Sequence, residues 1–446
     1  MQEVTRERSG RLAAAALAAL SLFIGPSAMA GDQTHVFTGA EILTISGEPI
    51  DSGVLVIEGG TITAVGAAGD VTVPAGATVH DMTGKTLMPG LVDTHSHIGG
   101  PFAADRSAPI QPGVRSLDGV DVRSPGFQRA RSGGLTTLNL MSGSGHLMSG
   151  QTVYVKLRQG EVIDDLLIEH DQLDFAGGMK MANGTNSRRD PPFPGTRAKS
   201  AALVREQYIK AEEYRDKLAA AAEDPEKSPD RDLALEALVE ILDGERTVHH
   251  HTHRHDDILT VLRLKQEFGF EVVLHHVSDA WKVADQIAAA GVASSIIVVD
   301  SPGGKLEAMH VSLGNGAALE KAGALVGFHT DDWITDSRLF LRSAALAVRG
   351  GMSRKGALYG MTMAGAIMLG LEDRIGSLEV GKDADLIVLS GDPLSVYTKV
   401  EQTWVEGQKL FDLSLEKDRL TAVGGWGAGA PRHAHVACFD HLEEDR

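Results

Sequence analysis

The stretch Pro89-Gly90-Leu91-Val92-Asp93-Thr94-His95-Ser96-His97 decides the fold. A Pro-Gly turn leads into a short apolar run, which predicts a buried strand that ends in polar side chains. Residues two apart on a strand point to the same face, so His95 and His97 would project together from the end of this strand. Paired imidazoles suit a borderline divalent ion such as zinc. A His-x-His pair alone is a weak signal, and its place directly after an apolar strand makes it informative.

Downstream of this stretch the sequence repeats an order of apolar run, loop and helix. Helical periodicity is clear over 258–268 and 279–290. The strand-like runs match the strands of an α/β fold, a (β/α)8 TIM barrel, whose sites lie at the carboxyl ends of the strands. These runs cover residues 90–94, 135–141, 152–157, 177–182, 246–251, 271–276, 295–299 and 324–329.

Both ends of the mature chain have a different, β-type pattern. Short alternating runs separated by Gly-rich turns fill residues 35–90, and similar runs return at 385–389 and 402–405. We therefore predict a small β-sandwich domain built from 31–90 and 376–412, a barrel domain over 91–375, and a C-terminal tail over 413–446. The Pro-rich and helical segment 183–245 is expected to overhang the barrel mouth.

The composition narrows the class of partner. The chain has 446 residues and a formal net charge of −18 with histidine neutral. A surface this acidic repels nucleic acids and anionic membranes, so neither is expected as a partner. We expect a small-molecule substrate, and the sequence leaves open whether the chain forms a homo-oligomer.

The N-terminus has the layout of a secretory signal peptide. Arginines at 6, 8 and 11 precede an apolar stretch over 12–24, and Ala28-Met29-Ala30 supplies the small residues of a cleavage site. The apolar stretch is shorter than the roughly 20 residues of a bilayer span. We expect residues 1–30 to be removed and the protein to be exported, periplasmic or secreted, without stable membrane insertion. An uncleaved anchor is the alternative. The single cysteine, Cys438, excludes a disulfide framework.

Three further motifs put histidine or aspartate at the end of an apolar run. They are the histidine-rich stretch 249–255, the stretch Leu274-His275-His276, and Gly327-Phe328-His329-Thr330-Asp331. A carboxylate directly after an apolar strand is costly unless it binds a cation or is hydrogen-bonded. The alternatives are a solvated His-rich loop for the first motif, a satisfied core histidine for the second, and a helix cap for Asp331.

Together these motifs resemble the amidohydrolase superfamily, specifically its imidazolonepropionase-like and prolidase-like branch with a binuclear metal centre. The resemblance runs from about residue 35 to 412 and so covers nearly all of the mature chain. The stretch 81–97 is similar to the family's entry into its first barrel strand. The stretch 371–386 is similar to its return to the β domain.

The resemblance implies a role for each matching residue. Six residues would hold two divalent ions, with zinc favoured, and they are His95, His97, Lys180, His251, His276 and Asp331. Lys180 would be carboxylated by CO2 to N6-carboxylysine and bridge the ions, whereas an ordinary surface lysine is the alternative. Asp331 would also be the general base. His253 would stabilise the oxyanion, or else support a neighbouring ligand.

The implied activity is metal-dependent hydrolysis of an amide-like C–N bond by a metal-bridged hydroxide. A dipeptide, an N-acyl amino acid or a cyclic amide would fit as substrate. Arg254 would clamp a substrate carboxylate or form a salt bridge within the protein. His275 replaces the glutamate that the family usually has before its strand-six ligand, which leaves the register between His275 and His276 open.

Two other functions stay open at this point. The first is a mononuclear deaminase of the same superfamily, against which the sequence shows no glutamate near His251. The second is a non-enzymatic periplasmic metal-binding protein, suggested by the histidines of 249–255. The number of tightly bound ions and the presence of turnover would distinguish these functions from the hydrolase.

Overall fold

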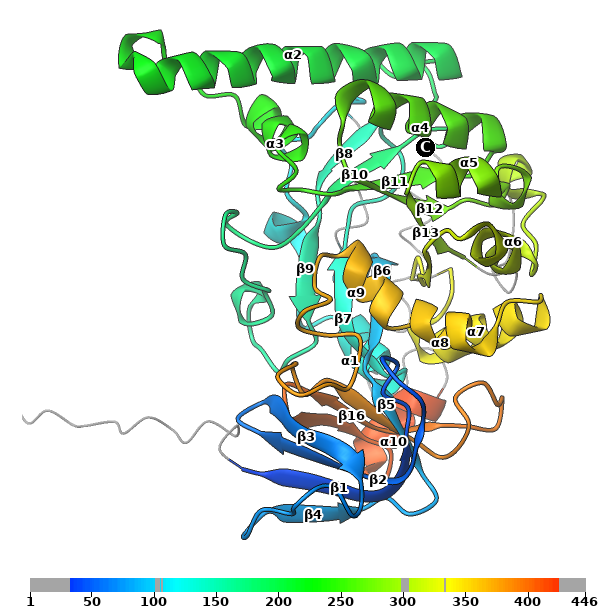
Figure 1. The fold of residues 1–446 in the computed structure, drawn as a ribbon. Helices are drawn as coiled ribbons and strands as arrows, with labels where there is room; N and C mark the ends of the chain where they lie inside the picture. The colour runs from blue at the N-terminus through cyan, green and yellow to red at the C-terminus, as the bar shows by residue number, and fades with distance from the viewer. Residues whose placement is uncertain (1–32, 101–104, 106, 298–304, 333, 425–446) are drawn as a thin grey trace, which may run out of the picture.

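The computed structural model describes residues 33–100, 105, 107–297, 305–332 and 334–424. They form a mixed α/β fold with an additional β-sheet at one end (Figure 1). The expected signal peptide over 1–30 lies outside the described residues. Among the helices described, none is both long and apolar enough to span a bilayer.

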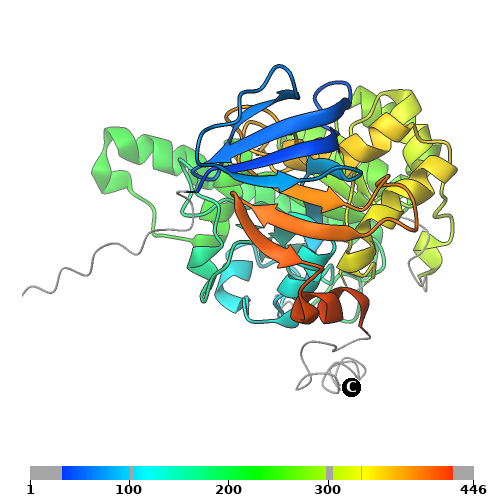
Figure 2. The ribbon, with the colours of Figure 1, turned by 90° about the horizontal axis from the view of Figure 1, so that it is seen from below.

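The additional sheet joins strands from both ends of the chain. Its order is β17-β16-β15-β5-β1-β2-β3, with β4 paired to β1 (Figure 2). All eight strands of the predicted β domain are linked in one hydrogen-bonded path, because β1 pairs with β2, β4 and β5 along its length. The strands are β1 (His35–Ile42), β2 (Ile50–Glu58), β3 (Thr61–Ala67), β4 (Thr78–Asp81), β5 (Thr86–Pro89), β15 (Leu386–Leu389), β16 (Val400–Val405) and β17 (Gln408–Asp412).

Alternating side chains explain why this sheet forms. One face of the strands buries Phe37, Leu55, Ile57 and Leu386 in a common cluster that also includes Trp404. The Trp404 ring meets the Phe37 ring edge-on at 5.1 Å between centroids, a favourable geometry for aromatic pairs. Burial of these side chains fixes the register, because a slip of one residue would move them all to the opposite face.

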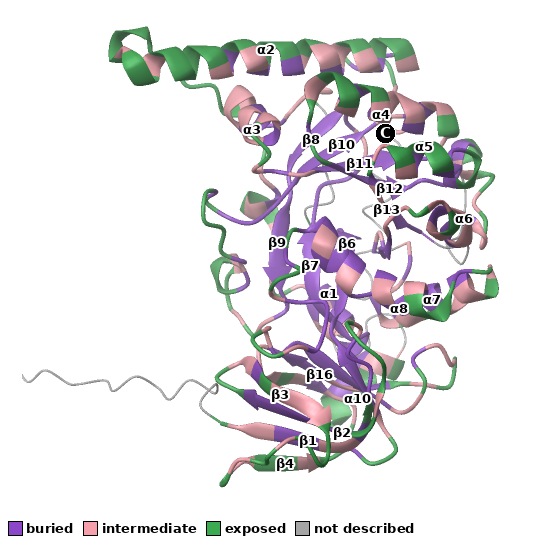
Figure 3. Cartoon of the chain, viewed as in Figure 1, coloured by how far each residue is buried: buried purple, intermediate pink, exposed green. Residues whose placement is uncertain are grey.

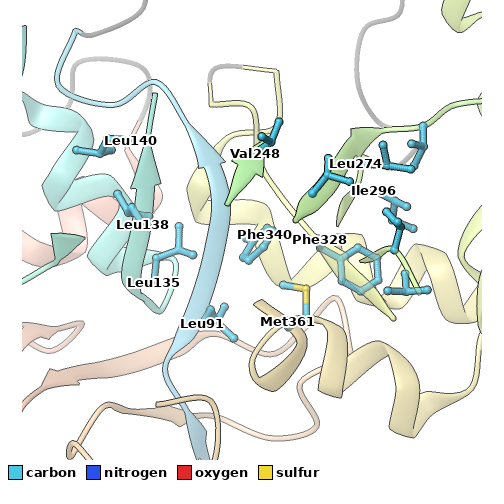
Figure 4. Packing of buried hydrophobic residues seen from close by; sticks show 14 of the residues in the cluster. Leu91, Leu135, Leu138, Leu140, Val248, Leu274, Ile296, Phe328, Phe340 and Met361 are labelled. Carbon is cyan, nitrogen blue, oxygen red and sulfur yellow. The ribbon is translucent and has the colours of Figure 1, made fainter. Parts of the chain in front are cut away.

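The second region contains seven parallel strands. β6 pairs with β7, and β10 to β14 pair in sequence order. They are β6 (Leu91–Ser96), β7 (Leu135–Leu140), β10 (Met179–Ala182), β11 (Val248–Thr252), β12 (Val272–His276), β13 (Ala293–Ile296) and β14 (Val326–Phe328). Buried apolar residues from these strands meet the neighbouring helices in one cluster, shown in part in Figure 4 with Leu91, Leu138, Val248 and Phe328.

The third predicted strand, 152–157, differs from the prediction. The strands β8 (Met148–Gln151) and β9 (Val153–Lys156) run antiparallel to β10 and β7 respectively. The connection from β7 to β8 is residues 141–147, which is shorter than the dozen or so residues that a parallel crossover needs. The prediction of eight parallel strands is therefore wrong at this position.

The last strand of this region ends beside the first. The Asp331 amide donates a hydrogen bond to the His95 carbonyl at 2.9 Å, and Ser96 forms a parallel bridge with Asp332. The carboxyl ends of β6 and β14 therefore lie side by side, so the residues that follow them share one rim.

Helices surround these strands (Figure 1). The helix predicted over 258–268 is confirmed by α4, whereas 279–290 divides into a 3-10 turn, Ala280–Lys282, and α5. The α-helices are α1 (Pro125–Ser132), α2 (Arg197–Glu223), α3 (Leu233–Leu242), α4 (His255–Phe268), α5 (Ala284–Ala289), α6 (Asn315–Ala322), α7 (Phe340–Arg349), α8 (Arg354–Gly360), α9 (Met363–Met368) and α10 (Glu416–Val423). The other 3-10 turns are Ser116–Gly119, Ile163–Asp165, Pro225–Lys227, Leu306–Ala308 and Ser337–Leu339.

The segment 183–245 lies mainly in the outer helix layer rather than over the strand ends. Helix α2 is largely exposed along its length (Figure 3). Tyr208 of α2 is fully buried and stacks on Phe268 and Phe270, with ring centroids 5.1 and 5.0 Å apart. This stacking holds α2 against α4 and the residues that follow α4.

Within the predicted tail, α10 contacts the rest of the protein through Asp418, which accepts a hydrogen bond from Gln128 at 3.0 Å.

Candidate metal centre and active site

The predicted site residues lie at the carboxyl ends of the parallel strands. His95 is the penultimate residue of β6, Lys180 is in β10, His251 is in β11, and His276 ends β12. β10, β11 and β12 are neighbours in one sheet, β6 belongs to a second sheet, and the residues after β14 bring the chain back to β6 at Asp331. Buried apolar residues hold these strands in place, so the polar side chains converge at one rim.

His95, His97 and Asp331 form the tightest group. Asp331 Oδ1 lies 2.9 Å from His97 Nε2 and 3.3 Å from His95 Nε2. The three side chains can each offer one ligand atom, all within 4.8 Å of one another. Burial raises the pKa of Asp331, but its polar neighbours, among them His97 and Lys180, outweigh this effect and hold the pKa below its usual range. Asp331 is therefore an ionised carboxylate facing two imidazoles.

Asp93 positions this group from behind. Its Oδ1 accepts hydrogen bonds from the His95 amide at 3.1 Å and the Thr330 amide at 3.0 Å, and its Oδ2 accepts one from the Thr330 hydroxyl. Burial raises the pKa of Asp93 to about 7 despite these bonds. Asp93 thus joins the end of β6 to the segment that carries Asp331.

Backbone strain accompanies the site. Asp331 has φ 49°, and His276 and Val277 have φ 69° and 40°. These left-handed conformations cost about 1–3 kcal/mol each in non-glycine residues, and they cluster at functional sites. In His276 the unusual backbone lets adjacent histidines both reach the interior, although neighbours on a regular strand point to opposite faces.

Lys180 is buried at the centre of the group. Its side chain is fully buried, so the alternative of an ordinary surface lysine is wrong. Its Nζ lies 3.0 Å from His95 Nε2 and 3.2 Å from Met141 Sδ. Burial lowers the pKa of Lys180 to about 7, more than the Asp331 charge raises it. A large fraction of this lysine is therefore a neutral amine near pH 7, the form that reacts with CO2.

His251 and His276 complete the cluster. Their ring centroids are 4.4 Å apart, and His276 Nδ1 lies 4.0 Å from Asp331 Oδ2. His276 Nδ1 also lies 3.0 Å from His329 Nε2, and His329 Nδ1 lies 2.8 Å from Ser295 Oγ. His329, for which the sequence suggested no role, therefore orients His276. All six predicted ligands thus belong to one continuous group.

His275 has a different environment. Its Nε2 lies 2.9 Å from His249 Nδ1, and His249 Nε2 lies 2.7 Å from the Tyr154 hydroxyl. His275 Nε2 is therefore engaged by His249, whereas His276 Nδ1 lies 4.0 Å from Asp331 Oδ2. A nitrogen of His275 also lies within 4.8 Å of ligand atoms of His95 and His329. This geometry favours His276 in the register that the sequence left open. Sequence reasoning missed Tyr154, because its strand is antiparallel and carries no polar motif.

Several buried nitrogens in this cluster lack hydrogen-bond partners. They include both ring nitrogens of His251, the Nε2 atoms of His253 and His276, and the Nδ1 atoms of His95 and His275. Burial lowers the pKa of His251 and His276 well below the usual range, so these rings are neutral and carry a free lone pair. An unsatisfied buried polar atom costs about 1–3 kcal/mol, and a metal ion bound there would satisfy it.

His97 gives a second test of the fit. Its Nδ1 lies 2.7 Å from the Met141 carbonyl oxygen, which can only accept, so Nδ1 must carry the proton. In the neutral ring Nε2 is then a lone pair, and it faces the Asp331 carboxylate at 2.9 Å. Two acceptors face each other here, which is an arrangement that a cation between them resolves. The residues present therefore fit divalent metal ions.

His253 lies next to the cluster and brings in a residue that the sequence did not suggest. The His253 ring is 4.7 Å from the His251 ring, and its Nδ1 lies 2.8 Å from Ser278 Oγ. A carboxylate oxygen of Glu307 lies within 4.8 Å of nitrogens of both histidines. Although no glutamate lies near His251 in the sequence, Glu307 lies near it in the folded chain. Arg254 forms a two-bond pair with Asp256 within the protein.

Comparison with known proteins identifies the family. The model of the Amidohydrolase family matches residues 275–410. The amidohydrolase tasK of Hapsidospora irregularis is 26% identical over 419 residues, covering 84% of this chain. The chain spans only 42% of the length of that relative. An imidazolonepropionase of Deinococcus radiodurans is 26% identical over 387 residues, which cover 77% of this chain and 86% of that protein.

A solved structure gives the firmest link. The crystal structure of an amidohydrolase from Thermotoga maritima MSB8 aligns with a TM-score of 0.79 and 30% sequence identity. The alignment covers 85% of this chain and all of that one. At this identity and coverage, the chain belongs to the amidohydrolase superfamily.

Proposed function

We propose that this protein is a metal-dependent hydrolase that cleaves an amide-like C–N bond in a small molecule, such as a dipeptide, an N-acyl amino acid or a cyclic amide. The observation that carries the proposal is the convergence of His95, His97, Lys180 and Asp331 at one rim, with Lys180 fully buried against His95. A buried amine among imidazoles and a carboxylate has no simple structural use, since each of these groups is costly to bury.

We further propose that the parallel strands close into a TIM barrel with one antiparallel segment. The pairing of β6 with β7, of β7 with β9, of β8 with β10, and the contact of β14 with β6 support this closure. In a barrel of this kind, the site belongs at the carboxyl ends of the strands.

His95, His97 and Asp331 would hold one divalent ion, and His251 and His276 would hold the other, with carboxylated Lys180 shared between them. Two such ions, zinc being favoured, would lower the pKa of a water molecule so that hydroxide is available near neutral pH, and would polarise the substrate carbonyl. Asp331 would take the proton of the attacking hydroxide and deliver it to the leaving nitrogen. Its depressed pKa keeps it ionised for this task.

The surrounding residues would hold this machinery in place. His329 orients His276, and Asp93 anchors both His95 and the Asp331 segment through hydrogen bonds. His253, with a free Nε2, would contact the substrate oxygen as negative charge develops. We also propose that the protein is exported, on the basis of the pattern of residues 1–30.

Asp331→Asn tests the assignment of the proton carrier. With dipeptides, N-acyl amino acids and cyclic amides as a screening set, the wild-type protein should hydrolyse at least one class. The variant should lose about 10²–10⁴-fold in kcat, while metal analysis of the same sample shows most of the metal retained. Near-normal turnover by the variant would contradict the role of Asp331.

A mononuclear deaminase is the second candidate, and the proximity of Glu307 to His251 and His253 favours it. A deaminase would release ammonia from amino-substituted heterocycles and would hold one ion. The hydrolase would hold two ions and release an amine from an amide. Measuring ammonia release and metal content on one preparation therefore separates the two.

A further inference from the structure

Glu307 is a buried carboxylate that the proposed mechanism does not use. It lies in the 3-10 turn Leu306–Ala308, and its side chain is 2% exposed. Its Oε2 accepts hydrogen bonds from the Thr185 amide at 2.8 Å and from Arg197 Nη2 at 3.4 Å. Its Oε1 is buried and has no hydrogen-bond partner. One half of this carboxylate is therefore fixed, and the other half is available.

The local backbone is shaped around this carboxylate. A Cβ atom at Gly184 would lie 2.7 Å from Glu307 Oε2, so a side chain at this position would displace the carboxylate. Gly184 also has φ +79°, which glycine adopts without strain. The turn at 184–185 and the first residue of α2 thus hold Glu307 in one orientation.

The neighbouring charges leave Glu307 without full compensation. Arg197 directs its Nε to both oxygens of Asp257, at 3.0 and 2.7 Å, so most of its charge is already paired. Lys305 lies two residues from Glu307. Burial lowers the pKa of Lys305, and the charges of Asp331 and Glu307 raise it, yet Glu307 Oε1 still has no hydrogen-bond partner. A buried carboxylate oxygen of this kind calls for a cationic donor.

We propose that Glu307 binds the free α-ammonium group of the substrate, so that the preferred substrates are amides and dipeptides with an unblocked amino terminus. This inference rests on the proposed hydrolase function and narrows its substrate class. One free oxygen matches the point charge of an ammonium group rather than the two-pronged fork of a guanidinium.

The distance between Glu307 and His251 favours a substrate amino group on the α carbon. The Glu307 carboxylate lies within 4.8 Å of a His251 nitrogen, and His251 is a proposed ligand of the centre where the scissile carbonyl would bind. An amino group one carbon from that carbonyl would reach Glu307, whereas an amine farther along a side chain would overshoot it. N-acyl amino acids place an uncharged acyl group there and leave the carboxylate unpaired.

The test uses a matched library of dipeptides with free and N-acetylated amino termini. Wild type should favour the free form, and Glu307→Gln should lose about 10- to 100-fold in kcat/KM for it, as expected for a hydrogen bond to a charged group, while N-acetyl substrates change little. Glu271→Gln, at a carboxylate that is 66% exposed, is the matched control and should behave as wild type. Metal content should be the same in all three proteins.

Binding without turnover provides an independent readout. Calorimetric titration of wild type with free amino acids and with their N-acetyl counterparts should show tighter binding of the free amines. Equal binding, equal hydrolysis of both library forms, or loss of metal from Glu307→Gln would overturn the inference, the last because Glu307 would then support the metal ligands. If wild type binds free amines but hydrolyses no amide, the proposed function fails while the ammonium site stands.

Discussion

Replacing Lys180 with methionine should stabilise the metal-free protein while removing part of its capacity to bind metal. Methionine has a similar length and no charge, so the substitution tests the cost of burying the amine. The Lys180 side chain is fully buried, and its pKa is lowered from the ordinary 10.5 to about 7 by burial. At about 1.4 kcal/mol per unit of pKa shift, burying the charged form costs about 5 kcal/mol.

The sign and the pH window follow from these two pKa values. Below pH 7 lysine is protonated in both the folded and the unfolded chain, so the full cost applies. Between pH 7 and 10.5 the unfolded chain binds more protons than the folded one, so wild-type stability rises with pH. At pH 9.5 only about 1 kcal/mol of the cost remains. The advantage of the variant should therefore be large at pH 6 and nearly absent at pH 9.5.

The substitution also removes two contacts of the amine. The Nζ atom lies 3.0 Å from His95 Nε2 and 3.2 Å from Met141 Sδ, and such bonds contribute about 1 kcal/mol each. The net gain for Lys180→Met at pH 6 should therefore be about 3 kcal/mol.

Denaturant unfolding of chelator-treated protein at pH 6 and pH 9.5 measures these differences. Lys210→Met is the control, because Lys210 is 49% exposed and pairs with Glu206 on a helix surface, where such a pair is worth under about 1 kcal/mol. The reasoning is refuted if Lys180→Met is less stable than wild type by the same amount at both pH values. It is equally refuted if the variant binds as much metal as wild type.

Two further predictions concern the framework of the site. Lys156→Met should destabilise the fold by about 3–5 kcal/mol, because Lys156 Nζ bonds to the buried Asp385 at 2.6 Å and also pairs with Asp383; denaturant unfolding would show this, and an unchanged midpoint would contradict it. Gly177→Ala should cost about 1–3 kcal/mol by overpacking, since its Cβ would lie 2.0 Å from the Thr152 carbonyl oxygen; thermal unfolding checks this, and a variant as stable as wild type would argue against it.

The sequence predicted those features that depend on local pattern. The motif around His95 and His97 indicated a strand with paired imidazoles, and the structure has β6 followed by those side chains. The amphipathic stretch that became α4 was also readable, since its period and its C-terminal Gly269 in the left-handed conformation are local signals.

Features that depend on long-range contacts could not be read in this way. Glu307 reaches His251 from a turn 56 residues farther along the chain, and no local pattern marks it. The direction of β8 and β9 was readable in principle, because the segment between the runs 135–141 and 152–157 is too short for a crossover helix. The sequence could not decide between His275 and His276 as the ligand, because the positive φ of His276 breaks the alternation of side chains along a regular strand.

Metal analysis of the purified mature protein, combined with anomalous diffraction from its crystals, tests the central claim most directly. The account predicts two tightly held divalent ions per chain, one against His95, His97 and Asp331 and the other against His251 and His276, with extra density on Lys180 Nζ. A correctly folded protein that retains no such pair, or ions bound elsewhere, would contradict it.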